Sequence, residues 1–228
     1  EKKGKTFRWS GSYEYDMNEA KTLKTELNAL TEFSAMVPEA FKSASHLFLG
    51  NIDPALQLKV IEQMDRPELI VIDTMNLWIE HKKEELLKAI QKSNILVFNE
   101  GEARMLFDTP SLVKAGKESL ALGLDAVIIK KGEHGSLMFT KNSHFNAPGY
   151  PLENLRDPTG CGDSFGGGLI GYLAKHGTLD ERALRKGIIL GSTIASFNAE
   201  AFGVDSLRTL QLSDIEKRFE EIKKMREF

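Results

Sequence analysis

Four short apolar runs, each rich in β-branched residues, alternate with segments of helical periodicity through the middle of the chain. The runs read HLFLGN, LIVID, ILVFN and AVIIKK. The segments between them read PALQLKVIEQM, KKEELLKAIQKS, EGEARMLF and SLVKAGKESLALG. Strands that are apolar at every position, rather than at every second one, are typical of a parallel sheet buried on both faces. The pattern therefore predicts an α/β fold in which helices cover both faces of a mostly parallel sheet.

Each of these runs ends in polar residues, which are Asn51, Asp73, Asn99, and the pair Lys130 and Lys131. The carboxyl ends of parallel strands lie along one edge of the sheet, and open α/β sheets bind ligands at that edge. We therefore expect a binding cleft there. For any one strand, a simple exit into a polar loop explains the residue equally well, and only the four ends together favour a cleft.

The remaining segments predict a small β structure near the start of the chain and helices near its end. KTFRWSGSYEYD predicts a hairpin with its turn at Ser10–Ser12, and GSLMFT with SHFNAP predicts a second hairpin. TLKTELNAL fits a strand or a helix, and its alternation favours the strand. Helices are expected from about Thr159, Glu181 and Ser213. The last of them would begin with a capping box formed by Ser213 and Glu216.

The composition limits the class of protein. The 228 residues are 41% hydrophobic, which predicts one domain over residues 1–228 with a substantial core. One cysteine excludes an intrachain disulfide and a cysteine-rich zinc site. A net charge of −3 argues against nucleic acid as a partner, so an anionic ligand needs a local site. Without a long apolar run or a secretory signal, we expect a cytoplasmic protein with no membrane partner.

The stretch DPTGCGDSFGGG, residues 157–168, opens one of the predicted helices with an unusual number of glycines. A glycine turn that enters a helix directs free N–H groups, and the positive end of the helix dipole, at one point that suits an anion. Gly160, Cys161 and Gly162 would supply these groups. A tight turn without any ligand explains the glycines of this turn equally well.

Four glycines inside the same helix, Gly166, Gly167, Gly168 and Gly171, sacrifice about 4 kcal/mol of helix propensity relative to alanine. We expect close packing against a neighbouring helix to offset this cost, because small residues permit a short distance between helix axes.

Asp163 lies in the first turn of this helix, beside the predicted anion site. Capping a helix is a common role for aspartate. Phosphoryl transfer, however, requires little more than an anion cradle, a metal ion and a carboxylate that orients the attacking hydroxyl. The adjacent cradle and carboxylate favour that reaction. Phe165 occupies the place of the third glycine of the dinucleotide fingerprint and no P-loop motif occurs, which disfavours a dinucleotide-dependent oxidoreductase.

These residues resemble the D-T-x-G-A-G-D signature of the ribokinase-like (PfkB) carbohydrate and nucleoside kinases, to which DPTGCGD is similar. NEGE is similar to the family's N-x-x-E, KKGEHG to its x-x-G-x-x-G, and DTMNLW to a D-x-N-x-x-x-L-W stretch, while ASFNAEAFG lies where the family closes over adenine. The resemblance covers residues 5–210, approximately. It implies a three-layer α/β/α fold with a mostly parallel central sheet and a small β lid to which residues 5–30 contribute.

The resemblance also implies a reaction, which is transfer of the γ-phosphoryl group of ATP to a hydroxyl of a small sugar or nucleoside. Asp163 would be the base that activates the hydroxyl, and the amides of residues 160–162 would hold the transferring group. Asn99 and Glu102 would organise Mg²⁺, with Glu102 acting through water. Lys130 would neutralise phosphate charge.

Further residues receive roles by the same resemblance. Gly132, Gly135 and Asn198 would line the nucleotide pocket. Asp157 and Thr159 match positions that hold a monovalent cation in some members, which implies a possible K⁺ site. The lid often serves in dimer contacts in this family, so the resemblance allows a homodimer through the lid and leaves the oligomeric state open.

Two departures from the family pattern bear on function. Pro158 and Cys161 replace the usual residues of the signature, and both leave the backbone cradle feasible. The family's glycine-rich sugar-binding segment is not found upstream of Thr6, so the fold is expected to lack an N-terminal part and the acceptor stays open. A nucleotide-binding regulatory module without catalysis is the alternative function. Asn99 as a plain helix cap and Glu102 as a solvated first-turn acid are the corresponding alternatives for the N-x-x-E pair.

Overall fold

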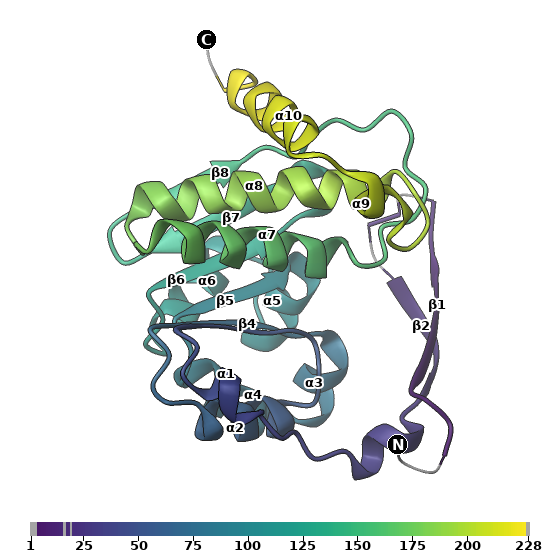
Figure 1. The fold of residues 1–228 in the computed structure, drawn as a ribbon, viewed down its shortest axis with the longest axis vertical. Helices are drawn as coiled ribbons and strands as arrows, with labels where there is room; N and C mark the ends of the chain where they lie inside the picture. Colours follow the sequence, from purple (N-terminus) through teal and green to yellow (C-terminus); the bar gives the residue numbers. More distant parts are fainter. Residues whose placement is uncertain (1–3, 16, 19, 227–228) are drawn as a thin grey trace.

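The computed structural model describes residues 4–15, 17–18 and 20–226, and it contains two separate sheets (Figure 1). The larger sheet has six strands in the order β3-β4-β5-β6-β7-β8. The first four pair in parallel and the last two are antiparallel additions. The strands are β3 (His46–Leu49), β4 (Leu69–Asp73), β5 (Ile95–Asn99), β6 (Ala126–Lys130), β7 (Ser136–Thr140) and β8 (His144–Ala147). The predicted mostly parallel sheet and its closing hairpin are confirmed.

Helices cover both faces of this sheet, which gives the predicted three layers (Figure 1). One face packs against α7 (Cys161–His176), α8 (Glu181–Ala199) and α10 (Leu212–Lys224). The other face packs against α2 (Pro54–Gln63), α3 (Asn76–His81), α4 (Lys83–Gln91), α5 (Glu100–Phe107) and α6 (Leu112–Leu120). Successive residues of β4 and β5 enter opposite cores, which explains why these strands are apolar throughout.

Short elements complete the fold. They are η1 (Asn28–Glu32), α1 (Glu39–Lys42), η2 (Gly132–His134) and α9 (Asp205–Thr209). Across the described part of the chain, no helix combines the length and apolarity needed to cross a bilayer.

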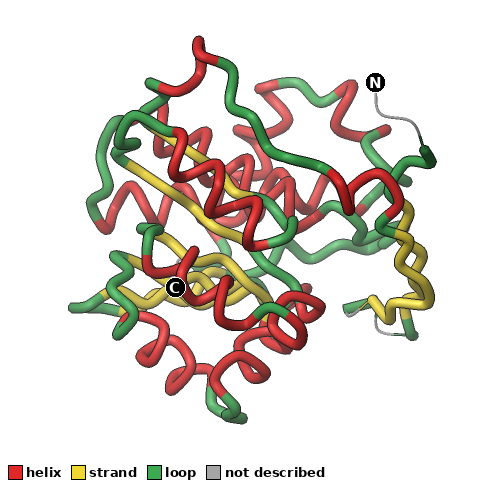
Figure 2. The backbone as a smooth tube through the Cα atoms, turned by 90° about the horizontal axis from the view of Figure 1, so that it is seen from below, coloured by secondary structure: helices red, strands yellow, loops and turns green. Residues whose placement is uncertain are grey.

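The smaller sheet is the predicted lid, formed by the antiparallel strands β1 (Arg8–Tyr13) and β2 (Ala20–Glu26). Two views show it set apart from the central sheet, beside the carboxyl ends of the parallel strands (Figures 1 and 2). The predicted turn at Ser10–Ser12 is wrong, because β1 runs through these residues with only a register shift between Ser10 and Gly11. The ring of Trp9 lies over Gly11, so that glycine serves close packing rather than a turn.

The four glycines of α7 that follow its first turn divide into two pairs. An added Cβ would lie 2.3 Å from the Phe48 ring at Gly166 and 2.9 Å from the Cα of Gly191 at Gly168, so close packing explains both. At Gly167 and Gly171 an added Cβ would meet nothing within 4 Å. The expectation of close packing is therefore confirmed for the first pair and wrong for the second, which lies on the exposed side of the helix. Only the buried pair gains from lacking a side chain.

The start of α10 also differs from the prediction. The helix begins at Leu212 rather than Ser213, and its first-turn contact joins the Gln211 N–H to Asp214 Oδ2 at 3.1 Å. The predicted capping box of Ser213 and Glu216 is therefore wrong by two residues. The capping box is formed instead by Gln211 and Asp214, which are also three residues apart.

Candidate active site

The carboxyl ends of β4, β5 and β6 bring polar side chains to one edge of the sheet. Asp73 ends β4, and Asn99 and Lys130 lie opposite each other at the ends of β5 and β6. The Lys130 ammonium lies 3.0 Å from Oδ2 of Asp73, so the ends of β4 and β6 are linked directly. Asn51, beyond the end of β3, accepts a 2.8 Å hydrogen bond from the indole N–H of Trp78. The polar strand ends therefore gather at one edge, as predicted.

The loop before α7 faces this edge. Gly160 is the N-cap residue of α7 and has a φ of +84°, a left-handed conformation that glycine adopts without strain. The Cys161 N–H donates to the Pro158 carbonyl at 3.1 Å, so this predicted donor is engaged in the turn. Among the described residues, the N–H groups of Gly160 and Gly162 have no hydrogen-bond partner. Two of the three predicted amides are thus available to an anion at the helix N-terminus.

Asn198 of α8 clamps this loop from behind. Its amide nitrogen donates to the Thr159 carbonyl at 2.8 Å, and its side-chain oxygen accepts from the Ser164 hydroxyl at 3.3 Å. The side chain is 2% exposed, so the visible role of Asn198 is to position the loop. The thiol of Cys161 donates to the Ala195 carbonyl, and burial raises its pKa, which keeps it protonated.

The predicted monovalent-cation residues also shape the loop. Asp157 is buried, and its Oδ1 accepts the Thr159 N–H at 2.9 Å. The Thr159 hydroxyl is hydrogen-bonded to the hydroxyl of Tyr13 from the lid at 3.1 Å. Another lid residue, Asn18, lies so close to Gly132 that a Cβ there would be 2.2 Å from its Oδ1. The lid therefore reaches two predicted segments of the site, the anion loop and the nucleotide loop.

Asp163 lies in the first turn of α7 with its side chain exposed, and no hydrogen bond or ion pair engages it within the described chain. Its Oδ1 is 3.9 Å from where a Cβ would lie at Gly50, which places the carboxylate over the end of β3. Desolvation by the surrounding protein and the negative charge of Asp73 raise the pKa of Asp163, while the positive charge of Lys130 lowers it. A raised pKa makes this carboxylate a better proton acceptor than an ordinary aspartate.

Lys130 places a cation close to the amide of Gly162. A Cβ at Gly162 would lie 3.2 Å from its Nζ, so the ammonium lies directly against the loop. Burial lowers the pKa of Lys130, but the charges of Asp73, Glu102 and Asp163 outweigh it and leave the pKa raised. The ammonium therefore stays charged at the mouth of the loop.

Asn99 and Glu102 form a capping box at the start of α5. The Glu102 N–H donates to Asn99 Oδ1 at 2.8 Å, and the Asn99 N–H donates to Glu102 Oε2 at 2.7 Å. Both residues thus have a structural role in addition to the predicted one. In the part of the chain that the structure describes, no group of three or more His, Cys, Asp or Glu side chains could hold a metal ion. A Mg²⁺ ion here would rely on water and phosphate oxygens for most of its ligands, as Mg²⁺ commonly does.

The glycines of the predicted nucleotide loop have local reasons as well. Gly135 has a φ of +80°, and a Cβ there would lie 2.0 Å from the Ala147 carbonyl. Gly132 also has a positive φ, of +53°. The two glycines thus let the loop between β6 and β7 turn tightly at the same edge as Lys130.

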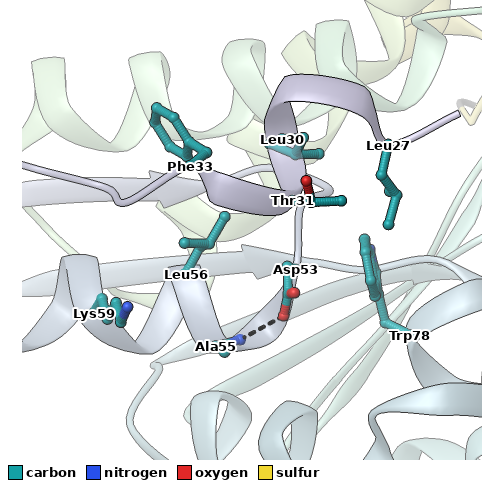
Figure 3. A pocket seen from close by; sticks show the side chains of 9 residues that line it. All are labelled: Leu27, Leu30, Thr31, Phe33, Asp53, Ala55, Leu56, Lys59 and Trp78. Carbon is teal, nitrogen blue, oxygen red and sulfur yellow. Dashed lines mark hydrogen bonds between the residues drawn. The ribbon is translucent and has the colours of Figure 1, made fainter. Parts of the chain in front are cut away.

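A separate pocket lies between η1, α2 and α3, where Leu27 points toward the Trp78 ring and Leu30, Phe33 and Leu56 contribute to the lining (Figure 3). Its Asp53 carboxylate is already engaged, with the Ala55 N–H at 3.0 Å and the Lys82 ammonium at 2.5 Å. The pocket therefore combines apolar side chains with polar ones, and its carboxylate already has partners.

The sequence placed Asp73 at the predicted cleft without a specific role, and it gave no site role to Tyr13 or Gly50. The position of Asp73 at the end of a buried strand indicated the cleft, but nothing in the sequence indicated its partner Lys130, which lies 57 residues away. No sequence signal indicated Tyr13, because its contact with Thr159 spans 146 residues of sequence.

Comparison with known proteins identifies the class of protein. The family model described as "pfkB family carbohydrate kinase" matches residues 18–209. The chain therefore belongs to the pfkB family of carbohydrate kinases. It is 30% identical over 159 residues to a nucleoside kinase of Methanocaldococcus jannaschii, a match that covers 69% of this chain and 49% of that protein. The chain spans about half the length of the curated relatives it matches, 49% and 53% for the first two.

Solved structures share the fold. The crystal structure of the M. jannaschii nucleoside kinase, described as an archaeal member of the ribokinase family, gives a TM-score of 0.72 at 23% identity, over 96% of this chain and 70% of that one. An E. coli protein assigned as a ribokinase II, solved with ATP and Mg²⁺, gives 0.70 at 22% identity, over 93% and 71%. The predicted ribokinase-like fold is confirmed.

Proposed function

We propose that this chain carries the phosphoryl-transfer site of a kinase that moves the γ-phosphoryl group of ATP to a hydroxyl of a small sugar or nucleoside. One observation carries the proposal: the carboxylate of Asp163 lies one residue beyond the amide of Gly162 at the N-terminus of α7, and within the described ranges of the chain neither group has a partner. Membership of the pfkB family and the names of the relatives, which include a nucleoside kinase and a cytidine kinase, support the reaction class.

The positively polarised groups of the site would bind the phosphoryl group, and the negatively charged one would act on the acceptor hydroxyl. The N–H groups of Gly160 and Gly162 and the ammonium of Lys130 would stabilise the negative charge of the transferring phosphoryl group. Asp163 would orient the acceptor hydroxyl and take its proton as the new O–P bond forms and the bond to ADP breaks. The proton then resides on the Asp163 carboxyl, and ADP leaves with the electron pair of the broken bond. Positioning matters more than base strength for such a loose transition state.

Metal ions fit the charges of this edge. Three carboxylates, those of Asp73, Glu102 and Asp163, act on the single ammonium of Lys130, which leaves a net negative charge suited to a divalent cation. Mg²⁺, bound with ATP, would neutralise the phosphate charge, with Glu102 and Asn99 holding it through water. Asp157 and Thr159 remain our proposed K⁺ residues, which would stabilise the loop beside the amides. Gly132, Gly135 and Asn198 remain the proposed nucleotide-pocket residues.

The lid is the proposed cover of the acceptor and a proposed dimer contact. Its strands lie beside the carboxyl ends of the parallel strands (Figure 1), and its large apolar side chains Phe7, Tyr15 and Leu23 are exposed. Such exposed residues suit contact with an acceptor or with a second copy of the chain.

A screen of ATP consumption tests the reaction, with ribose, fructose, deoxyribose, adenosine, cytidine and inosine as acceptors. We expect ADP release that depends on one class of acceptor and is lost in Asp163→Asn. ATP binding without turnover on any acceptor would instead support the second candidate, a nucleotide-binding module without catalysis.

A further inference from the structure

The ion pair between Asp73 and Lys130 lies close to a second carboxylate, that of Asp163, with which the ammonium of Lys130 could pair instead. The ammonium of Lys130 interacts electrostatically with three carboxylates, those of Asp73, Glu102 and Asp163. Of these, the structure pairs it with Asp73, through contacts of 3.0 Å to Oδ2 and 3.3 Å to Oδ1. Asp163, one residue beyond Gly162, has no hydrogen-bond or ion-pair partner among the residues that the structure describes. The arrangement keeps the ammonium beside the amide donors and the base unoccupied.

We propose that Asp73 is a positioning residue, which holds the Lys130 ammonium at the mouth of the anion loop and keeps it from pairing with the Asp163 carboxylate. This inference rests on the proposed function, because only a base and a phosphate site give the separation a purpose. Asp73 touches neither the acceptor nor ATP in this account, and it acts through Lys130.

The surroundings of Asp73 fit a fixed support. Its side chain is 6% exposed, against 19% for that of Lys130, so the carboxylate is the more rigidly enclosed partner. Oδ1 also accepts the Thr74 N–H at 2.9 Å, and the main-chain carbonyl of Asp73 accepts from Gln57 Nε2 at 3.1 Å. The same Gln57 nitrogen binds the Gly50 carbonyl at 2.9 Å, directly below Asp163. Gln57 thereby ties the support of the lysine to the strand end under the base.

Removal of Asp73 leaves a charged lysine with two remaining carboxylates. Glu102 is engaged with the Asn99 N–H, whereas Asp163 has no partner among the described residues. A partly buried ammonium needs a counter-charge, so Lys130 would turn toward Asp163 and pair with its carboxylate. The carboxylate oxygen that should accept the proton of the acceptor hydroxyl would then be occupied. The carboxylate would also be less basic.

A double-mutant cycle on the pKa of Asp163 tests this mechanism without requiring turnover. The carboxyl carbon of Asp163 is titrated by NMR in the wild type, Asp73→Asn, Lys130→Gln and the double variant, with Asp163→Asn identifying the signal. We expect Asp73→Asn to lower the pKa of Asp163 by about 1 unit or more in the wild-type background. In the Lys130→Gln background the decrease should be less than half as large. Equal decreases in both backgrounds would mean that Asp73 acts only by direct charge, and would overturn the inference.

Kinetics and controls complete the test. Asp73→Asn should lower kcat by about 10- to 100-fold with a smaller change in KM for ATP. The loss should be no greater in the double variant than in Lys130→Gln alone, whereas multiplied losses would contradict the mechanism. Lys130→Gln can still donate to Asp73, and Lys130→Met serves as a second background should the glutamine variant fold poorly. Asp125→Asn, which removes a carboxylate at the opposite end of β6, should change neither readout.

The outcome separates the two proposals. An inactive wild type would remove the proposed function while the titration still reports on Asp73. An active wild type with equal pKa decreases would remove only the role of Asp73.

Discussion

Alanine substitutions along α7 test how the helix that presents Asp163 is held in place. An added methyl group at Gly168 would lie 2.9 Å from the Cα of Gly191 and 3.1 Å from Cδ1 of Ile194. The first contact is with backbone, so α7 and α8 would have to separate. At Gly171 the same methyl group meets nothing within 4 Å. The two substitutions are chemically identical and differ only in what surrounds them.

The magnitudes follow from two opposing effects. Each alanine gains about 1 kcal/mol of helix propensity over glycine. Overpacking at Gly168 costs about 1–3 kcal/mol in addition, whereas Gly171 has no such cost. We therefore expect Gly171→Ala to raise the free energy of unfolding by about 1 kcal/mol, and Gly168→Ala to lie about 1–3 kcal/mol below it. In a chain of this size, 1 kcal/mol corresponds to a Tm change of about 2–4 °C.

Urea unfolding followed by circular dichroism measures these differences, with Tm as a second measure. Unchanged m values would show that the unfolded states are comparable. Equal stabilities for Gly168→Ala and Gly171→Ala would refute the packing of α7 against α8 as described. A destabilised Gly171→Ala would refute the exposure of that side of the helix.

Three further predictions address the site. Asn198→Leu keeps the side-chain volume but removes the clamp on the Thr159 carbonyl, and should lower the free energy of unfolding by about 1–3 kcal/mol and weaken ATP binding in calorimetry. Tyr13→Phe removes only the hydroxyl that joins the lid to Thr159, and should raise KM for the acceptor with little loss of Tm, whereas an unchanged KM would contradict the lid contact. Because the folded pKa of Asp163 is raised, its ionised form is disfavoured by folding; this penalty is present above the folded pKa and disappears below the unfolded one. Asp163→Asn should therefore not lower stability at pH 7, and the acid limb of kcat/KM in the wild type should have its midpoint above the ordinary aspartate pKa.

Much of the fold could be predicted because the signal was local. The runs that became β4 and β5 are apolar at every position, and only a strand with a core on each side requires that pattern. The lid turn could not be predicted from Ser10–Ser12, since the same serine–glycine pattern serves a strand whose glycine lies under the Trp9 ring. Glycines in α7 likewise look alike in sequence, and only the position of α8 distinguishes Gly168 from Gly171.

The site was predictable where one short motif contains both partners. Asn99 and Glu102 are three residues apart, and the amides of residues 160–162 lie in the same turn as the carboxylate of Asp163. Asp73 and Lys130 are 57 residues apart, and nothing in either segment indicates the other. Contacts of this kind depend on strand order, so their roles emerge only when β4, β5 and β6 are placed side by side.

The central claim is that Asp163 accepts the proton of the acceptor hydroxyl beside an amide-lined phosphate site. The most direct measurement compares kcat and the Kd for ATP between the wild type and Asp163→Asn, on the acceptor that the screen identifies. We expect kcat to fall by about 10²- to 10⁴-fold while the Kd for ATP changes less than about 3-fold. A variant that turns over as fast as the wild type would contradict the claim.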